Sequence, residues 1–268
     1  MNLKPDVFGR AVLGALPFIV IIVIYIIASE ARLAENPRDK LLPSFNSMAT
    51  TITNMAVHPS KRTGEYIFWN DTASSLKRLG MGIGVAAIIG LVFGILNGII
   101  PFARANLSPI ITVISLIPPL AILPVLFIVF GLGELSKVVL IAIGITPFII
   151  RDLQAKVLEL PKEQLIKAQT LGASTWLVIV RVILPQILPR LIETVRLSLG
   201  AAWLFLIAAE AIASTDGLGY RIFLVRRYLS MDVIIPYVAW ITLLAFMTDY
   251  FLRLISIKAF PWFHSTDK

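Results

Sequence analysis

Long apolar segments separated by short polar stretches constrain this chain more than any other feature of its sequence. They lie at residues 11–28, 80–101, 107–130, 138–150 (with a start near Leu135), 191–213 and 234–257. A helix needs about 20 mostly apolar residues to cross the hydrocarbon core of a bilayer. The chain is therefore expected to be an all-α polytopic membrane protein with about six transmembrane helices.

Composition agrees with a membrane protein and excludes several other classes. Hydrophobic residues make up 57% of the chain and charged residues 15%, whereas a soluble domain has about 25% charged residues. The lack of cysteine excludes disulfides, and His58 and His264 are too few for a histidine metal cluster. We attribute the net charge of +8 to basic residues that fix membrane topology, and not to nucleic-acid binding.

The N-terminal residues resemble a signal peptide, but we expect them to be retained. Lys4 and Arg10 precede the first apolar segment, which is followed by Ser-Glu-Ala. A run of about 18 apolar residues is long for a signal sequence and sufficient to cross a bilayer. We therefore predict an N-terminal transmembrane helix within residues 1–29, with its N-terminus inside. Residues 30–78 would then form a periplasmic loop in which Ser44 caps a short amphipathic helix.

Three glycines of the second apolar segment, Gly90, Gly94 and Gly98, recur every four residues. This spacing places them in one stripe on a helix, and such a bare stripe lets another helix approach closely in lipid. We therefore predict tight helix packing at this stripe. A short turn is expected after this helix, at residues 102–106.

Prolines interrupt the third apolar segment at Pro118, Pro119 and Pro124. Irregular backbone at membrane depth is tolerated where it is buried in protein or lines a cavity. Pro118 and Pro119, with Ser115 shortly before them, are therefore candidates for lining a translocation pathway. A purely structural kink is the alternative.

Glu210 is an acidic residue near the outer end of the fifth apolar segment. A carboxylate at membrane depth is costly and is taken as functional by default. Glu210 is therefore a fourth pathway candidate. The alternative is a structural role, in which a partly solvated carboxylate bonds to the loop at residues 214–219.

A polar stretch at residues 160–189 separates the fourth and fifth apolar segments. Pro161 is suited to begin a helix and Gly172 to end one, and Leu184-Pro185 marks a stop. Residues 151–190 hold six basic and three acidic side chains, and an excess of basic residues marks cytoplasmic loops. The sequence therefore predicts a short cytoplasmic helix outside the bilayer that contacts another protein.

Motifs typical of enzymes are missing from the sequence. No glycine is followed by lysine, so the chain has no P-loop and no Walker-type ATP site. No serine, histidine and aspartate set forms a recognisable nucleophilic motif. We therefore expect a non-enzymatic protein without a cofactor of its own.

The polar stretch resembles the EAA loop of ABC-importer permeases. That family pattern is Glu-Ala-Ala, three residues, Gly, nine residues, Ile, one residue and Leu-Pro. The matching positions here are Ala168, Gly172, Leu184 and Pro185. Val182 replaces the isoleucine, while Ile166 and Lys167 stand where the family has Glu-Ala.

Three further stretches look like the nitrate, sulfonate and taurine branch of the same family. They are Ile117 to Pro124, Phe130 to Lys137, and Ala208 to Glu210 running on to residues 217–219. Together with the EAA-like loop, the resemblance covers residues 70–257.

The resemblance implies a type I ABC-importer permease fold with a cytoplasmic coupling helix. It implies a permease core at residues 79–257, a coupling loop at about 152–189 and a cytoplasmic tail at 258–268. The residues expected to couple to the ATPase are Glu163, Lys167, Ala168, Leu171, Gly172, Ala173, Leu184 and Pro185.

The resemblance also implies partners. Two permease copies would form a homodimer in a bacterial inner membrane, with both termini in the cytoplasm. An ABC ATPase dimer would bind ATP and Mg, and a periplasmic or lipid-anchored binding protein would deliver the solute. That solute would be a small anion of the sulfonate and taurine, nitrate or bicarbonate class.

The alternative function is an ATP-independent channel or a secondary carrier. A secondary carrier often shows inverted repeats with paired broken helices. This sequence has one Pro-Pro break and no convincing second half. Solute flux through the chain alone would favour this alternative.

Overall fold

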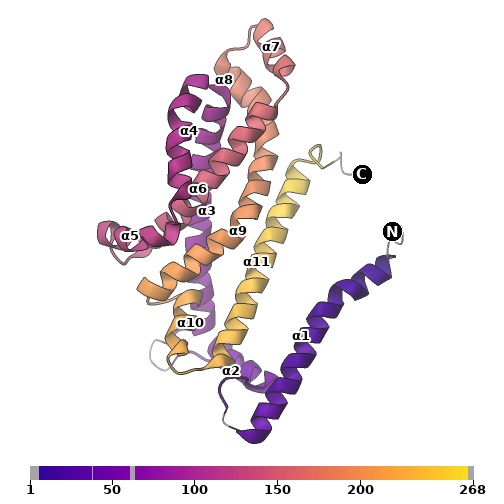
Figure 1. Ribbon diagram of the computed structural model, residues 1–268, viewed down its shortest axis with the longest axis vertical. Coiled ribbons are helices and arrows are strands. Elements are labelled where there is room, and N and C mark those ends of the chain that lie inside the picture. Colours follow the sequence, from indigo (N-terminus) through magenta and orange to yellow (C-terminus); the bar gives the residue numbers. More distant parts are fainter. Residues whose placement is uncertain (1–5, 38, 61–63, 265–268) are drawn as a thin grey trace. The chain divides into compact units, whose positions relative to one another are not determined.

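The computed structural model describes residues 6–37, 39–60 and 64–264, and the regular structure in these ranges is entirely helical (Figure 1). The elements are α1 (Val7–Glu35), α2 (Phe45–Val57), α3 (Ile67–Ile99), α4 (Pro101–Leu116), η1 (Pro119–Ile122), α5 (Leu123–Phe130), α6 (Glu134–Glu159), α7 (Lys162–Thr170), α8 (Thr175–Val178), η2 (Ile179–Ile183), α9 (Leu184–Ala213), α10 (Leu218–Arg226) and α11 (Met231–Ala259). Within the described ranges, five helical segments are long and apolar enough to cross a membrane. Pro101–Leu116 and Pro119–Phe130, bent by 83°, make a sixth if they count as one span. The expected all-α class with about six spans is confirmed.

The chain divides into two compact units. The first holds Met1–Trp69 and Ile222–Ala239, and the second holds Asn70–Arg221 and Trp240–Lys268. The first five and the last four residues, which include Lys4 and the end of the predicted tail, lie outside the described residues.

The first unit contains α1 and α2. α1 continues to Glu35, beyond the predicted end near residue 29, because residues 30–35 are mostly good helix formers. Ser44 accepts a hydrogen bond from the backbone N–H of Ser47 at 3.2 Å, which confirms the predicted cap of α2.

α3 begins at Ile67, well before the predicted start at Gly80. The polar residues before Gly80 were expected to belong to a loop, yet Asp71, Ser75 and Arg78 are buried. Their spacing places them on one helix face, and partners in the second unit satisfy their polar groups. The polar composition therefore reflects a buried polar face and not a loop.

The glycine stripe of α3 packs against α6. A Cβ at Gly94 would lie 2.7 Å from the Cβ of Leu153, and Cβ atoms at Gly90 and Gly98 would collide with Ile149 and Val157. A glycine stripe permits this close approach because no side chain stands between the two helices. The predicted packing role of these glycines is confirmed.

The expected turn at residues 102–106 is wrong, because these residues form the first turns of α4. Pro101 stands in the first turn, where its fixed φ angle favours a helix and its missing N–H leaves no bond unmade. Arg104 donates to the carbonyls of Asn97 at 2.9 Å and Gly98 at 2.6 Å. Arg104 therefore satisfies carbonyls at the end of α3 while belonging to α4.

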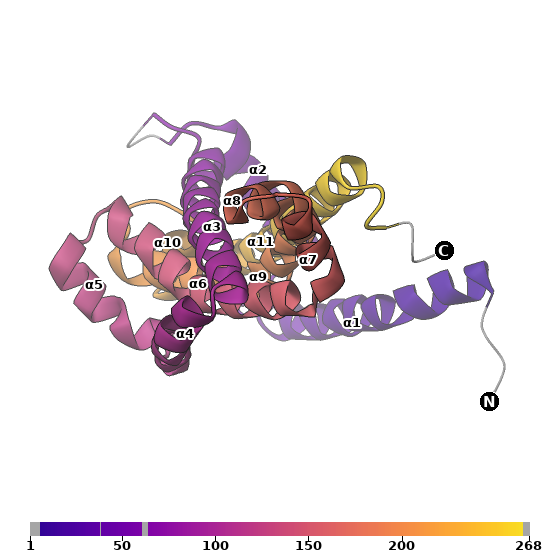
Figure 2. The ribbon, with the colours of Figure 1, turned by 90° about the horizontal axis from the view of Figure 1, so that it is seen from above.

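The core of the second unit lies between α6 and α9, which run side by side (Figures 1 and 2). Leu140, Leu153 and Leu206 are fully buried or nearly so. Gly144 of α6 is in contact with the ring of Phe205 of α9, because a Cβ at Gly144 would overlap that ring. α6 therefore packs closely against α3 and also against α9.

Candidate functional site

The polar stretch after α6 forms an elbow, residues 160–178, at one end of the second unit (Figure 1). Pro161 precedes α7, and Gly172 follows it with a φ angle of +86°, a conformation that glycine adopts without strain. The N–H of Ala173 closes the helix end by donating to the carbonyl of Ala168 at 3.1 Å. The predicted start and end of this short helix are confirmed.

The elbow presents apolar side chains that nothing in the described chain covers. α7 contains no buried residue, and Leu171 and Trp176 are 82% and 73% exposed. Ile166, at the position of the family's acidic residue, is also exposed. Ile166 and Leu171 lie outside the candidate spans, and Trp176 lies at the very start of the segment Thr175–Ala213. Exposed apolar side chains grouped in this way indicate a protein contact surface.

The two charged candidates lie at opposite ends of α7. Glu163 is in its first turn and Lys167 in its last, so each charge complements the helix dipole. Both side chains are exposed, whereas Ala168 and Ala173 are half-buried. With Lys162, which is also exposed, α7 therefore offers charges of both signs to a partner.

The predicted stop at Leu184-Pro185 is wrong. α8, the π-helical turn η2 and α9 form one helical segment from Thr175 to Ala213, and Pro185 is in the first turn of α9. Proline cannot donate the usual bond to the carbonyl four residues earlier, and the π turn before it absorbs that irregularity. Leu184 and Pro185, both half-buried, lie beyond the elbow and not on its exposed surface.

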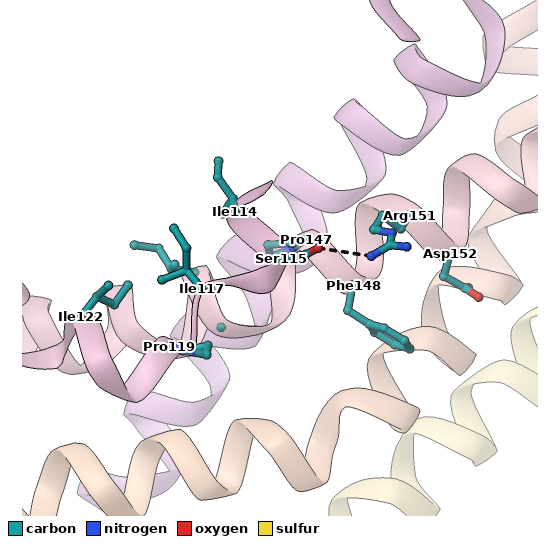
Figure 3. A pocket seen from close by; sticks show the side chains of 11 residues that line it. Ile114, Ser115, Ile117, Pro119, Ile122, Pro147, Phe148, Arg151 and Asp152 are labelled. Atoms are coloured by element: carbon teal, nitrogen blue, oxygen red, sulfur yellow. Dashed lines mark hydrogen bonds between the residues drawn. The ribbon is translucent and has the colours of Figure 1, made fainter. Parts of the chain in front are cut away.

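A cavity of about 550 Å³ lies between the broken pair of α4 and η1 on one side and α6 on the other (Figure 3). Its apolar lining comprises Ile114, Ile117, Pro119, Ile122, Ile143, Gly144, Pro147 and Phe148, and its polar lining comprises Ser115, Arg151 and Asp152. Two of the predicted pathway residues, Ser115 and Pro119, thus lie at one cavity. Pro118, extended at ψ 117°, precedes η1 at the break and is not among the lining residues.

Arg151 was expected only to contribute to topology, but it reaches the cavity. Its Nη1 donates to Ser115 Oγ at 3.2 Å (Figure 3). The sequence signal was present, because Gly144, Pro147, Phe148 and Arg151 have the i, i+3, i+4, i+7 spacing of one helix face. All four line the cavity.

Asp152, the other charged residue at the cavity, is already paired. It accepts hydrogen bonds from Arg190 at 2.7 and 2.8 Å and from Thr194 at 2.5 Å. Arg190 and Thr194 belong to α9. Asp152 therefore joins α6 to α9, and its charge is balanced by Arg190.

Glu210, the fourth pathway candidate, lies elsewhere, in a buried polar cluster. Its side chain is fully buried, so the expected partial solvation is wrong. It accepts hydrogen bonds from Arg78 at 2.7 Å, from Ser75 at 2.8 and 2.9 Å, and from the N–H of Gly219 at 2.9 Å. The bond to Gly219 agrees with the predicted tie to the 214–219 loop, and the arrangement favours the structural alternative.

Arg78 is the centre of this cluster, and sequence reasoning missed it. Its side chain is 2% exposed and also binds Glu134 at 2.6 and 2.8 Å and the Asp216 carboxylate at 2.5 Å. Burial acts to raise the pKa of Asp216, but hydrogen bonds from Ser74 and Arg78 outweigh it and hold that pKa below its ordinary range. Arg78 thereby joins α3, the start of α6, α9 and the loop before α10.

Comparison with known proteins identifies the family. Residues 79–260 match the model of the family described as binding-protein-dependent transport system inner membrane component. The taurine transport system permease protein TauC of Escherichia coli (strain K12) is 37% identical over 194 residues, covering 72% of this chain and 70% of that protein. The putative aliphatic sulfonates transport permease protein SsuC of Bacillus subtilis (strain 168) is 33% identical over 198 residues, covering 71% and 69%.

A solved structure shares the fold. The chain aligns with one from inward-facing conformations of the MetNI methionine ABC transporter with a TM-score of 0.58 and 22% identity, covering 73% of this chain and 99% of that chain. The chain therefore belongs to the family of binding-protein-dependent transport system inner membrane components, the membrane-spanning permease subunits of ABC importers.

Proposed function

We propose that this permease imports a small sulfonate anion, and that separate ATPase subunits bound at the elbow drive the import. The observation that carries the proposal is the elbow itself, which groups exposed apolar side chains on α7, on the turn after it and at the start of α8. The solute class is supported by the two relatives, whose names specify taurine and aliphatic sulfonates. Taurine and the aliphatic sulfonates both carry a sulfonate group.

The coupling step assigns roles to the elbow residues. Leu171 and Trp176 insert into an apolar groove of the ATPase, and Glu163 and Lys167 pair with charges at its rim. Gly172 lets the chain turn back so that these side chains share one surface. The ATPase subunits hold ATP and Mg, and their closure moves the elbow.

The complete transporter contains two copies of this chain in the bacterial inner membrane, with both termini in the cytoplasm. An external binding protein, as the family description indicates, delivers the solute to the outer face. The pathway runs past the break between α4 and η1, where Ser115, Pro118 and Pro119 lie. Glu210 contributes by holding helices together and not by contacting the solute.

An uptake assay tests the proposal. The permease, purified with its ATPase and reconstituted in liposomes, is expected to import taurine or ethanesulfonate only with ATP and the binding protein. Nitrate and bicarbonate serve as competitors. Solute flux through the chain alone, without ATP, would contradict the proposal and favour a channel or carrier.

A matched pair of variants tests the elbow. Leu171→Glu places a charge on the proposed contact and is expected to abolish co-purification of the ATPase. Leu132→Glu makes the same change at another exposed leucine, outside the elbow, and is expected to retain the ATPase. Equal retention in both variants would exclude the elbow as the docking surface.

A further inference from the structure

We propose that Arg151 and Ser115 form a binding site for the sulfonate group of the solute within the pathway, with the apolar cavity wall receiving its carbon chain. This inference rests on the proposed function and specifies where the anion is held. It concerns one cavity and one uncompensated positive charge (Figure 3).

The charge balance of the cavity favours an anion. Asp152 is neutralised by Arg190 across a 2.7 Å ion pair. Among the described residues, no carboxylate lies within ion-pair distance of Arg151, whose guanidinium donates a hydrogen bond to Ser115 Oγ at 3.2 Å. Arg151 is exposed, so its positive charge is accessible to an oxyanion that enters the cavity, and the apolar wall beside it screens that attraction less than bulk water would.

The geometry of the two polar groups suits a sulfonate. A guanidinium presents its N–H donors in a planar fork that binds two oxygens of an oxyanion at once. The hydroxyl of Ser115 donates to the carbonyl of Thr112 at 2.7 Å and accepts from Arg151 Nη1 at 3.2 Å, so Ser115 orients the guanidinium at the cavity. A sulfonate has three equivalent oxygens, of which two can bind the guanidinium fork at once.

The shape of the cavity suits a solute with a short carbon chain. Its volume of about 550 Å³ lies within the range of sites that hold small organic ligands. Ile117, Pro119 and Phe148 form apolar wall beside the polar pair. An alkanesulfonate can satisfy both parts, whereas an inorganic oxyanion leaves the apolar wall without a partner.

Because the chain contains no cysteine, a single introduced thiol can test the site. Arg151→Cys removes the charge, and the reconstituted transporter is expected to import ethanesulfonate about tenfold more slowly, as for the loss of one charged hydrogen bond. ATP hydrolysis stimulated by the binding protein is expected to persist. Arg151→Lys is expected to retain part of the uptake, and Arg253→Gln, an exposed residue outside the cavity, all of it.

Chemical modification of the introduced thiol then reverses or deepens the defect. Labelling with 2-aminoethyl methanethiosulfonate restores a positive charge and is expected to raise uptake. Labelling with 2-sulfonatoethyl methanethiosulfonate places a tethered ethanesulfonate in the cavity and is expected to stop uptake. Free ethanesulfonate is expected to slow both labelling reactions, and wild-type transporter treated with each reagent corrects for thiols of the ATPase.

Three outcomes would overturn the inference. The first is wild-type uptake by the Arg151→Cys transporter, and the second is the same effect from both reagents. The third is a combination of two observations: the uptake defect appears only in liposomes with anionic lipid, and ethanesulfonate does not slow the labelling of the thiol. This combination would indicate that the guanidinium binds a lipid headgroup. If Arg151→Cys fails to assemble, Ser115→Ala and Arg151→Lys provide the same comparison. No ATP-dependent sulfonate uptake by the wild type would instead refute the proposed function.

Discussion

Replacing Arg78 by methionine is expected to destabilise the protein strongly, because the substitution leaves Glu210 without its cationic partner. Arg78 and Glu210 have side chains 2% and 0% exposed, and they are joined at 2.7 Å. Removing one partner of such a buried pair costs about 3–5 kcal/mol, since the remaining charge stays buried and uncompensated. Glu134, at 56% exposed, keeps its access to solvent and adds little to this cost.

The measurement is an SDS titration of the detergent-solubilised protein, followed by tryptophan fluorescence. Lys156→Met is the control, because Lys156 and its partner Glu159 are 38% and 62% exposed. Loss of this surface pair is expected to cost less than about 1 kcal/mol. The double variant Arg78→Met with Glu210→Gln removes both charges and is expected to be more stable than Arg78→Met alone. If the double variant is less stable than the wild type by the sum of the two single effects, the uncompensated buried charge is not the cause.

Three further predictions concern other sites, and each is measured by unfolding of the purified protein. Gly98→Ala is expected to destabilise the protein by about 1–3 kcal/mol, because the added Cβ collides with Val157. Gly84→Ala adds a Cβ in open space and is expected to stabilise the protein by up to about 1 kcal/mol. Equal effects of the two substitutions would refute the packing argument. Gly172→Ala is expected to cost about 1 kcal/mol, because its Cβ meets no atom and only the positive φ angle is strained; a much larger loss would indicate a hidden contact. The lowered pKa of Asp216 stabilises the folded state at pH values above the pKa of an unfolded aspartate, about 4. This contribution is lost as the pH falls through the lower pKa of the folded state. Asp216→Asn is expected to remove this part of the acid sensitivity, and an unchanged dependence of stability on pH would contradict the prediction.

The sequence predicted most reliably the features that depend on local chemistry. The ends of α7 follow from Pro161 and Gly172, since proline favours the start of a helix and glycine tolerates the conformation at its end. The packing face of α3 follows from the four-residue spacing of its glycines. These signals need no knowledge of distant residues.

Features that depend on distant partners were not predictable in this way. Arg78 and Glu210 are 132 positions apart, and no local pattern links them. The polar start of α3 was assigned to a loop because its buried partners come from elsewhere in the chain. Pro185 was assigned as a stop because a preceding π turn, which lets the helix continue, has no recognised residue pattern.

α6 connects the Arg78 cluster, the cavity and the elbow. It begins at Glu134, which binds Arg78, passes the cavity at Arg151, and ends at Glu159 next to the elbow. At 1.5 Å per residue, Arg151 lies about 12 Å along the helix from Glu159. The elbow and the cavity are therefore joined by two helical turns of α6, held on one side by the glycine stripe of α3 and on the other by α9. Because these packed neighbours resist local bending, we expect a displacement of the elbow to move the Arg151 guanidinium with α6.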